Sequence, residues 1–363
     1  MLKTLLLTHE YYPFSGGVAR YCYNLFKFLP KDKYLEVCDN PVVKSKDNII
    51  HLKLQYKFIK PSWLFSLFQL SRIIRQEKVE QIFTPNILPL GSIAYLFFKF
   101  LKIPYVISLH GLDINNALKN KPRITKLILK SAKAIVCNTK YTASRLAGLG
   151  LEEKTVVIYP SLTNLPEPGQ SDVDLKGQYH IQSDEKVLLT VARLTHRKGH
   201  DLVLKSLANL RNLKFKYLIV GLGPEMDNLK KLVQEKKLED RVVFCGEVAD
   251  SMLVSFYKLA DIFVMPHRQL ANDVEGLGMV FLEAASFSLP IIAGISGGVS
   301  EIFTDQRNII FIKNDSVAEL ELALTSLLNN DKLALNLGQE ASLVVKNFPS
   351  ASEQSQELTK ILS

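Results

Sequence analysis

Short apolar segments alternate with amphipathic segments along most of the chain, and this alternation predicts parallel strands joined by crossover helices. We expect strands at 4–8, 48–54, 82–84, 105–109, 134–138, 156–159, 187–192, 217–220, 242–246, 261–265 and 290–294. We expect helices at 19–29, 61–75, 142–149, 201–210, 251–260 and 352–362, and another that starts near residue 278. The pattern therefore predicts an α/β protein.

A polar stretch interrupts this alternation at residues 161–182, where proline and glycine recur and no hydrophobic period is visible. We therefore expect one Rossmann-like domain at 1–163, a linker at 164–182, a second Rossmann-like domain at 183–348 and a C-terminal helix at 349–363. A chain of 363 residues is long enough to bury two cores. The predicted architecture is two such domains facing each other across a cleft, with ligand loops at the carboxyl ends of the strands.

The charge is distributed unevenly between the two predicted domains. Residues 1–163 carry 24 Lys and Arg against 10 Asp and Glu, a net +14, whereas the remaining residues carry 21 against 26, a net −5. This asymmetry points to an anionic surface or partner for the first half. We expect no nucleic-acid partner.

The predicted location is the cytoplasm. The four cysteines are scattered without a C-x-x-C pair, which excludes a disulfide framework or a zinc site and suits a reducing compartment. The apolar run at residues 1–7 is too short for a signal peptide, and the apolar stretch 86–101 is shorter than the roughly 20 residues that a spanning helix needs.

Two basic segments of the first half have alternative interpretations. The predicted helix 61–75 is amphipathic and carries Arg72 and Arg75, and eight basic residues without any acid lie between Lys119 and Arg145. These features are typical either of packed helices with solvated faces or of peripheral contact with the anionic inner face of the plasma membrane.

The densest chemistry lies at residues 266–301, where Glu275 and Glu283 bracket a glycine turn that leads into an apolar helix. If the helix starts near Gly278, Glu283 lies in its first turns, close to free backbone N–H groups that can bind an anion. Gly297 and Gly298 form a second turn that lets the backbone approach a phosphate. Since carboxylates accept hydrogen bonds from sugar hydroxyls, a ligand with both phosphate and hydroxyl groups fits this segment. The alternative is a capped helix with two solvated glutamates.

Further candidate ligand residues follow the predicted strands. They are Gly16 and Gly17 after 4–8, His110 and Asp113 after 105–109, Arg193 and Lys198 after 187–192, Gly223 after 217–220, and Glu247 after 242–246. Plain tight turns and a core-satisfied histidine are the alternatives. The Asp172-Val173-Asp174 sequence lies in the polar linker with no strand ahead of it, so we interpret it as solvated and expect no metal site.

The segment 266–301 resembles glycosyltransferase family 4, whose pattern is P-S-x-x-E-G-F-G-x-x-x-x-E-A followed by G-x-P-V-I-A and G-G-x-x-E. The matching positions are Glu275, Gly276, Gly278, Glu283, Ala284, Pro290, Gly297, Gly298 and Glu301. The chain departs from the pattern at His267 for serine, at Leu277 for phenylalanine, and in a longer approach at 269–274. The glycine pair at 16–17, the H-G-x-D at 110–113 and the R-L-x-x-x-K-G at 193–199 also resemble family motifs, with Ala192 in place of a glycine.

The resemblance implies a retaining glycosyltransferase of the GT-B fold in surface polysaccharide or glycolipid biosynthesis. It would move a hexose or N-acetylhexosamine from a nucleotide-diphosphate sugar to a glycan or lipid-linked acceptor without a metal or other cofactor. The first domain would bind mainly the acceptor, the second the nucleotide, and the terminal helix would cross back to the first domain.

The resemblance also assigns roles to the candidate residues. The implied catalytic residues are Glu275 and His110 at the donor sugar and Arg193 and Lys198 at the leaving diphosphate. The implied substrate-binding residues are Gly16, Gly17, Asp113, Gly223, Glu247, Gly276, Leu277, Gly278, Glu283 (at the ribose), Gly297 and Gly298. Two other hypotheses remain open, namely a sugar-nucleotide epimerase or hydrolase of the same architecture and a non-catalytic sugar-nucleotide-binding module.

Overall fold

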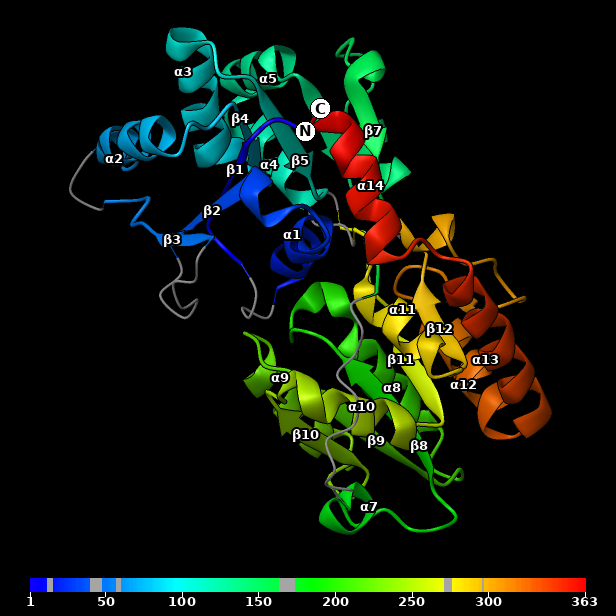
Figure 1. Ribbon diagram of the computed structural model, residues 1–363. Coiled ribbons are helices and arrows are strands. Elements are labelled where there is room, and N and C mark those ends of the chain that lie inside the picture. The colour runs from blue at the N-terminus through cyan, green and yellow to red at the C-terminus, as the bar shows by residue number, and fades with distance from the viewer. Residues whose placement is uncertain (12–15, 40–47, 57–59, 163–173, 271–275, 296) are drawn as a thin grey trace. The chain divides into compact units, whose positions relative to one another are not determined.

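The computed structural model describes residues 1–11, 16–39, 48–56, 60–162, 174–270, 276–295 and 297–363 (Figure 1). The chain divides into two compact units. Unit 1 comprises Met1–Thr163 together with Pro349–Ser363, and unit 2 comprises Asn164–Phe348.

Unit 1 is built on a parallel sheet with the strand order β3-β2-β1-β4-β5-β6-β7. The strands are β1 (Thr4–Thr8), β2 (Tyr34–Cys38), β3 (Ile49–His51), β4 (Gln81–Thr84), β5 (Tyr105–Leu109), β6 (Ala134–Cys137) and β7 (Thr155–Val157). The helices are α1 (Gly17–Lys27), α2 (Leu64–Gln76), α3 (Ser92–Leu101), α4 (Leu112–Asn120), α5 (Pro122–Ser131), α6 (Lys140–Ser144) and α14 (Ala351–Ile361).

Helices cover both faces of this sheet, which is why its strands are apolar without alternation. In β1, Leu5 and Leu7 pack in one core with α2, α3 and α5, whereas Leu6 packs in the other with α1 and α14. All three leucines are fully buried.

The C-terminal helix α14 belongs to unit 1, where it lies against α1 (Figure 1). Leu358 and Leu362 are fully buried, and Ser355 Oγ donates to the carbonyl of Leu25 at 2.8 Å. The N–H of Leu2 donates to the carbonyl of Leu362 at 3.0 Å, so the two ends of the chain meet.

Unit 2 is built on a second parallel sheet with the strand order β10-β9-β8-β11-β12-β13. The strands are β8 (Lys186–Val191), β9 (Phe215–Val220), β10 (Val242–Gly246), β11 (Ile262–Met265), β12 (Ile291–Gly294) and β13 (Ile310–Ile312). The helices are α7 (Leu175–Gln178), α8 (His200–Asn209), α9 (Met226–Glu235), α10 (Asp250–Leu259), α11 (Met279–Ser286), α12 (Val317–Leu328) and α13 (Asp331–Lys346).

In each sheet, successive strands are added first towards one edge and then towards the other. The switch falls between β1 and β4 in unit 1 and between β8 and β11 in unit 2. Open parallel sheets bind ligands at such switch points, beyond the carboxyl ends of the strands. The fold therefore directs attention to the loops that follow these strands.

Some predicted elements differ from the structure for local reasons. Strand β2 was not predicted, because the buried Glu36 interrupts its apolar pattern. Helix α6 is shorter than predicted: Thr139 caps its start by accepting from the N–H of Thr142, and the glycines at 148 and 150 have left-handed φ angles. Within the predicted linker, Asp174 caps the short helix α7, while Asp172 lies outside the described residues.

In the part of the chain that the structure describes, no helix combines the length and apolar character needed to cross a bilayer.

Candidate functional site

The loops after β8 and β11 meet at the switch point of unit 2. Gly199 has a φ of +77°, and a Cβ placed on it would lie 2.3 Å from the carbonyl oxygen of Pro266. The N–H of Arg268 donates to the carbonyl of Arg197 at 2.6 Å. Only glycine permits this close approach, which holds the turn after β8 against the extension of β11.

This packing positions the two predicted phosphate ligands. Arg193 is the second residue after β8 and is exposed, whereas Leu194 beside it is fully buried and its N–H donates to the carbonyl of Leu222 at 3.0 Å. Lys198 is half-buried in the tight helical turn His196–Lys198, which leads directly into α8. Both cations therefore lie at the carboxyl edge of the sheet, on anchored backbone.

The loop after β9 packs against the loop after β8. A Cβ on Gly221 would lie 2.1 Å from the carbonyl oxygen of Ala192, and one on Gly223 would lie 2.3 Å from that of Leu194. The close packing of the two loops by itself explains why both positions are glycine. A contact between Gly223 and the substrate therefore stays a prediction. Glu247 follows β10 at the same edge and is exposed.

Helix α11 starts after Gly278, whose φ is +70°, as the sequence predicts. The N–H of Gly298 donates to the carbonyl of Gly276 at 2.6 Å, so the two predicted glycine turns lie together. Leu277, between Gly276 and Gly278 in the first turn, is buried. Gly297 is half-buried and has a φ of +64°. Glu275 lies outside the described residues.

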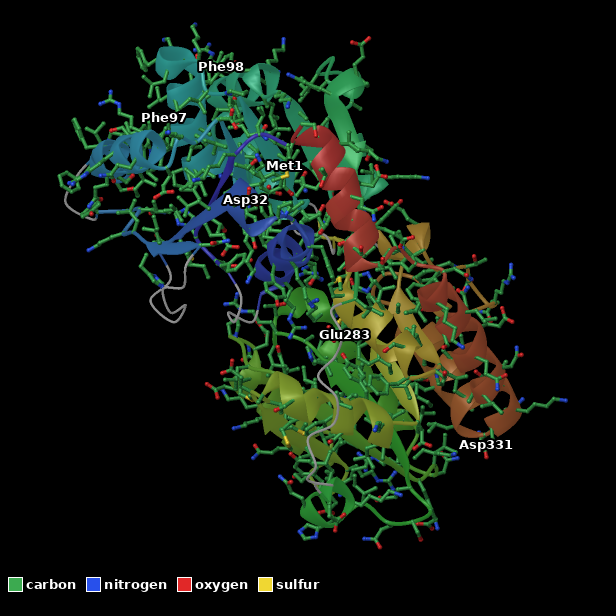
Figure 2. All side chains as sticks on the ribbon, viewed as in Figure 1. Met1, Asp32, Phe97, Phe98, Glu283 and Asp331 are labelled. Carbon is green, nitrogen blue, oxygen red and sulfur yellow. The ribbon has the colours of Figure 1, made fainter. Side chains whose placement is uncertain are left out.

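Glu283 is the fifth residue of α11 and is labelled in Figure 2. Its side chain is only 3% exposed, so the alternative of a solvated glutamate is wrong. The hydroxyl of Tyr257, on α10, donates to Glu283 Oε2 at 2.7 Å. The sequence did not indicate Tyr257, because the two residues are 26 positions apart in the chain.

In unit 1, His110 follows β5 and its backbone N–H donates to Asp113 Oδ1 at 2.9 Å. The His110 ring packs edge-on against Tyr21, and Nε2 lies 3.2 Å from Ser108 Oγ. Burial lowers the pKa of His110 to about 4, so the imidazole is neutral at pH 7. It can therefore both donate to and accept from a hydroxyl group.

Burial also raises the pKa of Asp113 to about 6, although backbone N–H groups, that of His110 first, oppose the shift. Its carboxylate closes the glycine turn that follows β5, where Gly111 has a φ of +98°. The structure thus gives Asp113 a role in shaping the loop that carries His110.

The glycine pair at the switch point of unit 1 lies at the start of α1. Gly16 precedes the helix and its carbonyl accepts from the N–H of Arg20 at 3.0 Å. No described atom lies within 4 Å of a Cβ placed on Gly17, so packing does not require this glycine. The helix start is accessible there, as a ligand site requires.

Two protein-family models match long stretches of the chain. Residues 173–344 match the family of group 1 glycosyl transferases, and residues 15–162 match Glycosyltransferase Family 4. The chain belongs to the family 4, group 1 glycosyltransferases.

Several curated proteins are similar over most of their length. A GDP-mannose-dependent alpha-(1-6)-phosphatidylinositol monomannoside mannosyltransferase from Mycolicibacterium smegmatis is 25% identical over 92% of this chain and 91% of its own. The alpha-monoglucosyldiacylglycerol synthase of Streptococcus pneumoniae is 25% identical over 83% of this chain and 73% of its own.

Solved structures confirm the fold. HepE from Anabaena, determined in complex with UDP and glucose, superimposes with a TM-score of 0.82 at 19% identity over 100% of this chain and 99% of its own. Sucrose-phosphate synthase from Thermosynechococcus elongatus has a TM-score of 0.82 at 18% identity, over 99% of this chain and 98% of its own. The protein has the α/β GT-B fold.

Proposed function

We propose that the protein is a retaining glycosyltransferase that moves a hexose or N-acetylhexosamine from a nucleotide-diphosphate sugar to a glycan or lipid-linked acceptor. The observation that carries this proposal is the meeting of two loops at the switch point of unit 2. One loop bears Arg193 and Lys198, and the other leads into α11 with Glu283. Cations and a buried carboxylate at one sheet edge suit a ligand with both a diphosphate and a ribose.

In this proposal the chemistry is electrostatic. As the diphosphate leaves, negative charge grows on its oxygens, and Arg193 and Lys198 stabilise that charge at fixed positions. Glu283 holds the ribose hydroxyls, and Glu275 holds the sugar and stabilises its developing positive charge. The diphosphate itself takes the acceptor proton on the attacked face, so the configuration at the anomeric carbon is retained and neither a protein nucleophile nor a metal is required.

Unit 1 supplies the acceptor side and one contact to the donor sugar. The neutral ring of His110 bonds a sugar hydroxyl, and the start of α1 at Gly16 and Gly17 faces the donor phosphates or the acceptor. The names of two relatives, a phosphatidylinositol mannoside mannosyltransferase and a glucosyldiacylglycerol synthase, support a lipid-linked acceptor.

We further propose peripheral contact with an anionic membrane, at the inner face of the plasma membrane. On unit 1, helices α2 and α3 expose Phe68 at 73% and Phe100 at 71%. Basic residues accompany these side chains in or next to the same helices, namely Arg72, Arg75, Lys99 and Lys102. Aromatic side chains among lysines and arginines fit the boundary between lipid headgroups and acyl chains.

The test is turnover of GDP-mannose, UDP-glucose and UDP-N-acetylglucosamine, each with and without a glycosylated lipid acceptor, in buffer containing EDTA. We expect one donor to be consumed only with acceptor, and NMR of the product to show the donor's anomeric configuration. Sugar release at the same rate without acceptor would instead establish a hydrolase, and an isomerised nucleotide sugar would establish an epimerase. Donor binding without any turnover would establish a binding module.

A further inference from the structure

The side chain of Arg268 bonds three other parts of unit 2 from a buried position. It follows β11, is only 2% exposed, and was not among the residues that the sequence singled out. Its Nη1 donates to Asp201 Oδ1 at 2.7 Å and its Nη2 to Asp201 Oδ2 at 2.9 Å. Nη1 also donates to the carbonyl of His196 at 2.6 Å, and Nε donates to Asp315 Oδ1.

One side-chain and one backbone hydrogen bond from Arg268 hold the turn that carries Lys198. The Arg268 guanidinium donates to the carbonyl of His196, and the Arg268 backbone N–H donates to the carbonyl of Arg197. Consecutive carbonyls of the turn are therefore fixed by one residue. The paired Asp201 lies in the first turn of α8, so the same guanidinium also fixes the start of that helix.

Only arginine can make this set of contacts. A guanidinium is planar and offers five N–H donors in a rigid fork, whereas a lysine offers one flexible ammonium group. Asp201 is in turn bonded by Lys205 Nζ at 3.0 Å. The arrangement therefore combines a two-pronged ion pair with a carbonyl contact that fixes the turn.

We propose that Arg268 is a positioning residue for the leaving diphosphate, acting through the turn His196–Lys198 rather than by touching the ligand. The inference rests on the proposed function, because it assumes that Lys198 binds a diphosphate. Since charge stabilisation depends on the exact distance between a cation and the developing charge, loosening the turn weakens diphosphate binding without altering the contacts of the nucleoside.

The test measures binding of UDP, GDP, uridine and guanosine by calorimetry to the wild type and to Arg268→Lys, with Arg268→Gln as a second variant. For the nucleotide that the wild type binds, we expect the Kd of the diphosphate to rise at least tenfold and that of the nucleoside to change less than twofold. The control is Arg241→Lys. Arg241 also donates to two backbone carbonyls, those of Leu213 and Arg211, but at the amino-terminal edge of the same sheet.

A double-mutant cycle with Lys198→Ala tests the route of the effect. If Arg268 acts through the turn, Arg268→Lys has little further effect on diphosphate binding once Lys198 is alanine. Equal losses for nucleoside and diphosphate, equal losses in Arg241→Lys, or full additivity with Lys198→Ala would each overturn the positioning role.

If the Arg268 variants fail to fold, the exposed partner is changed instead: Asp315→Asn is expected to raise the diphosphate Kd in the same selective manner, and an unchanged Kd overturns the proposal. Failure of the wild type to bind either diphosphate would overturn the proposed function, and this inference with it.

Discussion

The phenolic hydroxyl of Tyr257 donates a hydrogen bond of 2.7 Å to Oε2 of Glu283. The two side chains come from successive helices, α10 and α11, and both are buried. The Tyr257 ring is stacked on Phe287 with an angle of 10° between the planes, which fixes the direction of the hydroxyl. The carboxylate that we assign to the ribose is therefore oriented before any ligand arrives.

Substituting Tyr257→Phe removes this hydroxyl while keeping the ring. Because a hydrogen bond to a charged group contributes about 1.5–3 kcal/mol, we expect the donor Kd to rise by about 10-fold or more, with a smaller change in kcat. The measurement is donor titration by calorimetry alongside steady-state kinetics. Tyr217→Phe is the matched control, because it removes another buried hydroxyl, 2.8 Å from Thr190 Oγ1, in the middle of the sheet. Equal loss of affinity in both variants would contradict an orienting role for Tyr257.

Neutralising the two cations after β8 tests the electrostatic mechanism. We expect the double substitution Arg193→Ala and Lys198→Ala to lower kcat/KM by about 10²-fold or more, because both charges act on the diphosphate as it leaves. Steady-state kinetics with the preferred donor measure the effect. Lys214→Ala, which removes an exposed ion pair with Asp184, is the control and should leave kcat/KM unchanged. Full activity of the double variant would exclude the proposed site.

The neutral state of His110 has a testable pH dependence. Burial lowers its pKa to about 4, so the ring should stay uncharged as pH falls from 7 to 5. An exposed histidine would instead be half protonated at about pH 6.5. NMR of the ring protons, assigned by comparison with His110→Gln, measures this directly. Because the folded pKa is lowered, protonation favours the unfolded state, and this residue's contribution to stability should be lost as pH falls from about 6.5 towards 4. A titration midpoint near 6.5 in the native protein would contradict the burial of the ring.

Asp201 makes a separate contribution to acid stability. Burial alone would raise its pKa, but the hydrogen bonds from Arg268 and then Lys205 outweigh this effect and lower the pKa to about 2. The stabilisation is therefore complete above the unfolded-state pKa of about 3.9 and is lost as pH falls to about 2. It amounts to about 2–3 kcal/mol. Urea unfolding from pH 5 to pH 2.5 should show a shallower decline for Asp201→Asn than for the wild type. Parallel curves for the two proteins would mean that the ion pair contributes nothing.

The sequence predicts the strands and the glycine turns better than the side-chain partners. Runs such as Leu5–Leu7 identify strands because both faces of a parallel sheet are buried, and Gly278 identifies a helix start because the backbone there is left-handed. Both signals are local in the chain. They predicted the start of α11 and most of the parallel strands.

The partners of the site residues depend on contacts across long stretches of chain. Arg268 and Asp201 are 67 residues apart, and no periodicity links them until β8 and β11 become neighbours in the sheet. Glu36 caused a different, local error. Strand β2 was not predicted because a buried carboxylate is not expected in an apolar strand. Burial raises its pKa to about 7, against a hydrogen bond from Tyr11 that lowers it.

The exposed aromatic residues of unit 1 allow a test of membrane contact. Phe68 of α2 and Phe100 of α3 are more than two-thirds exposed. Moving one such ring from water into the lipid interface is favourable by up to about 3 kcal/mol. We expect Phe68→Ser with Phe100→Ser to weaken binding to vesicles containing anionic phosphatidylglycerol by about 10-fold or more, measured by co-sedimentation. Binding of the wild type should also fall as salt rises, because lysines and arginines contribute.

Leu322→Ser is the matched control, since Leu322 is 72% exposed but lies on α12 of unit 2, the half of the chain with net negative charge. Equal binding of the wild type to neutral phosphatidylcholine vesicles, or an equal loss in the control, would show that these two helices do not dock the enzyme on an anionic membrane.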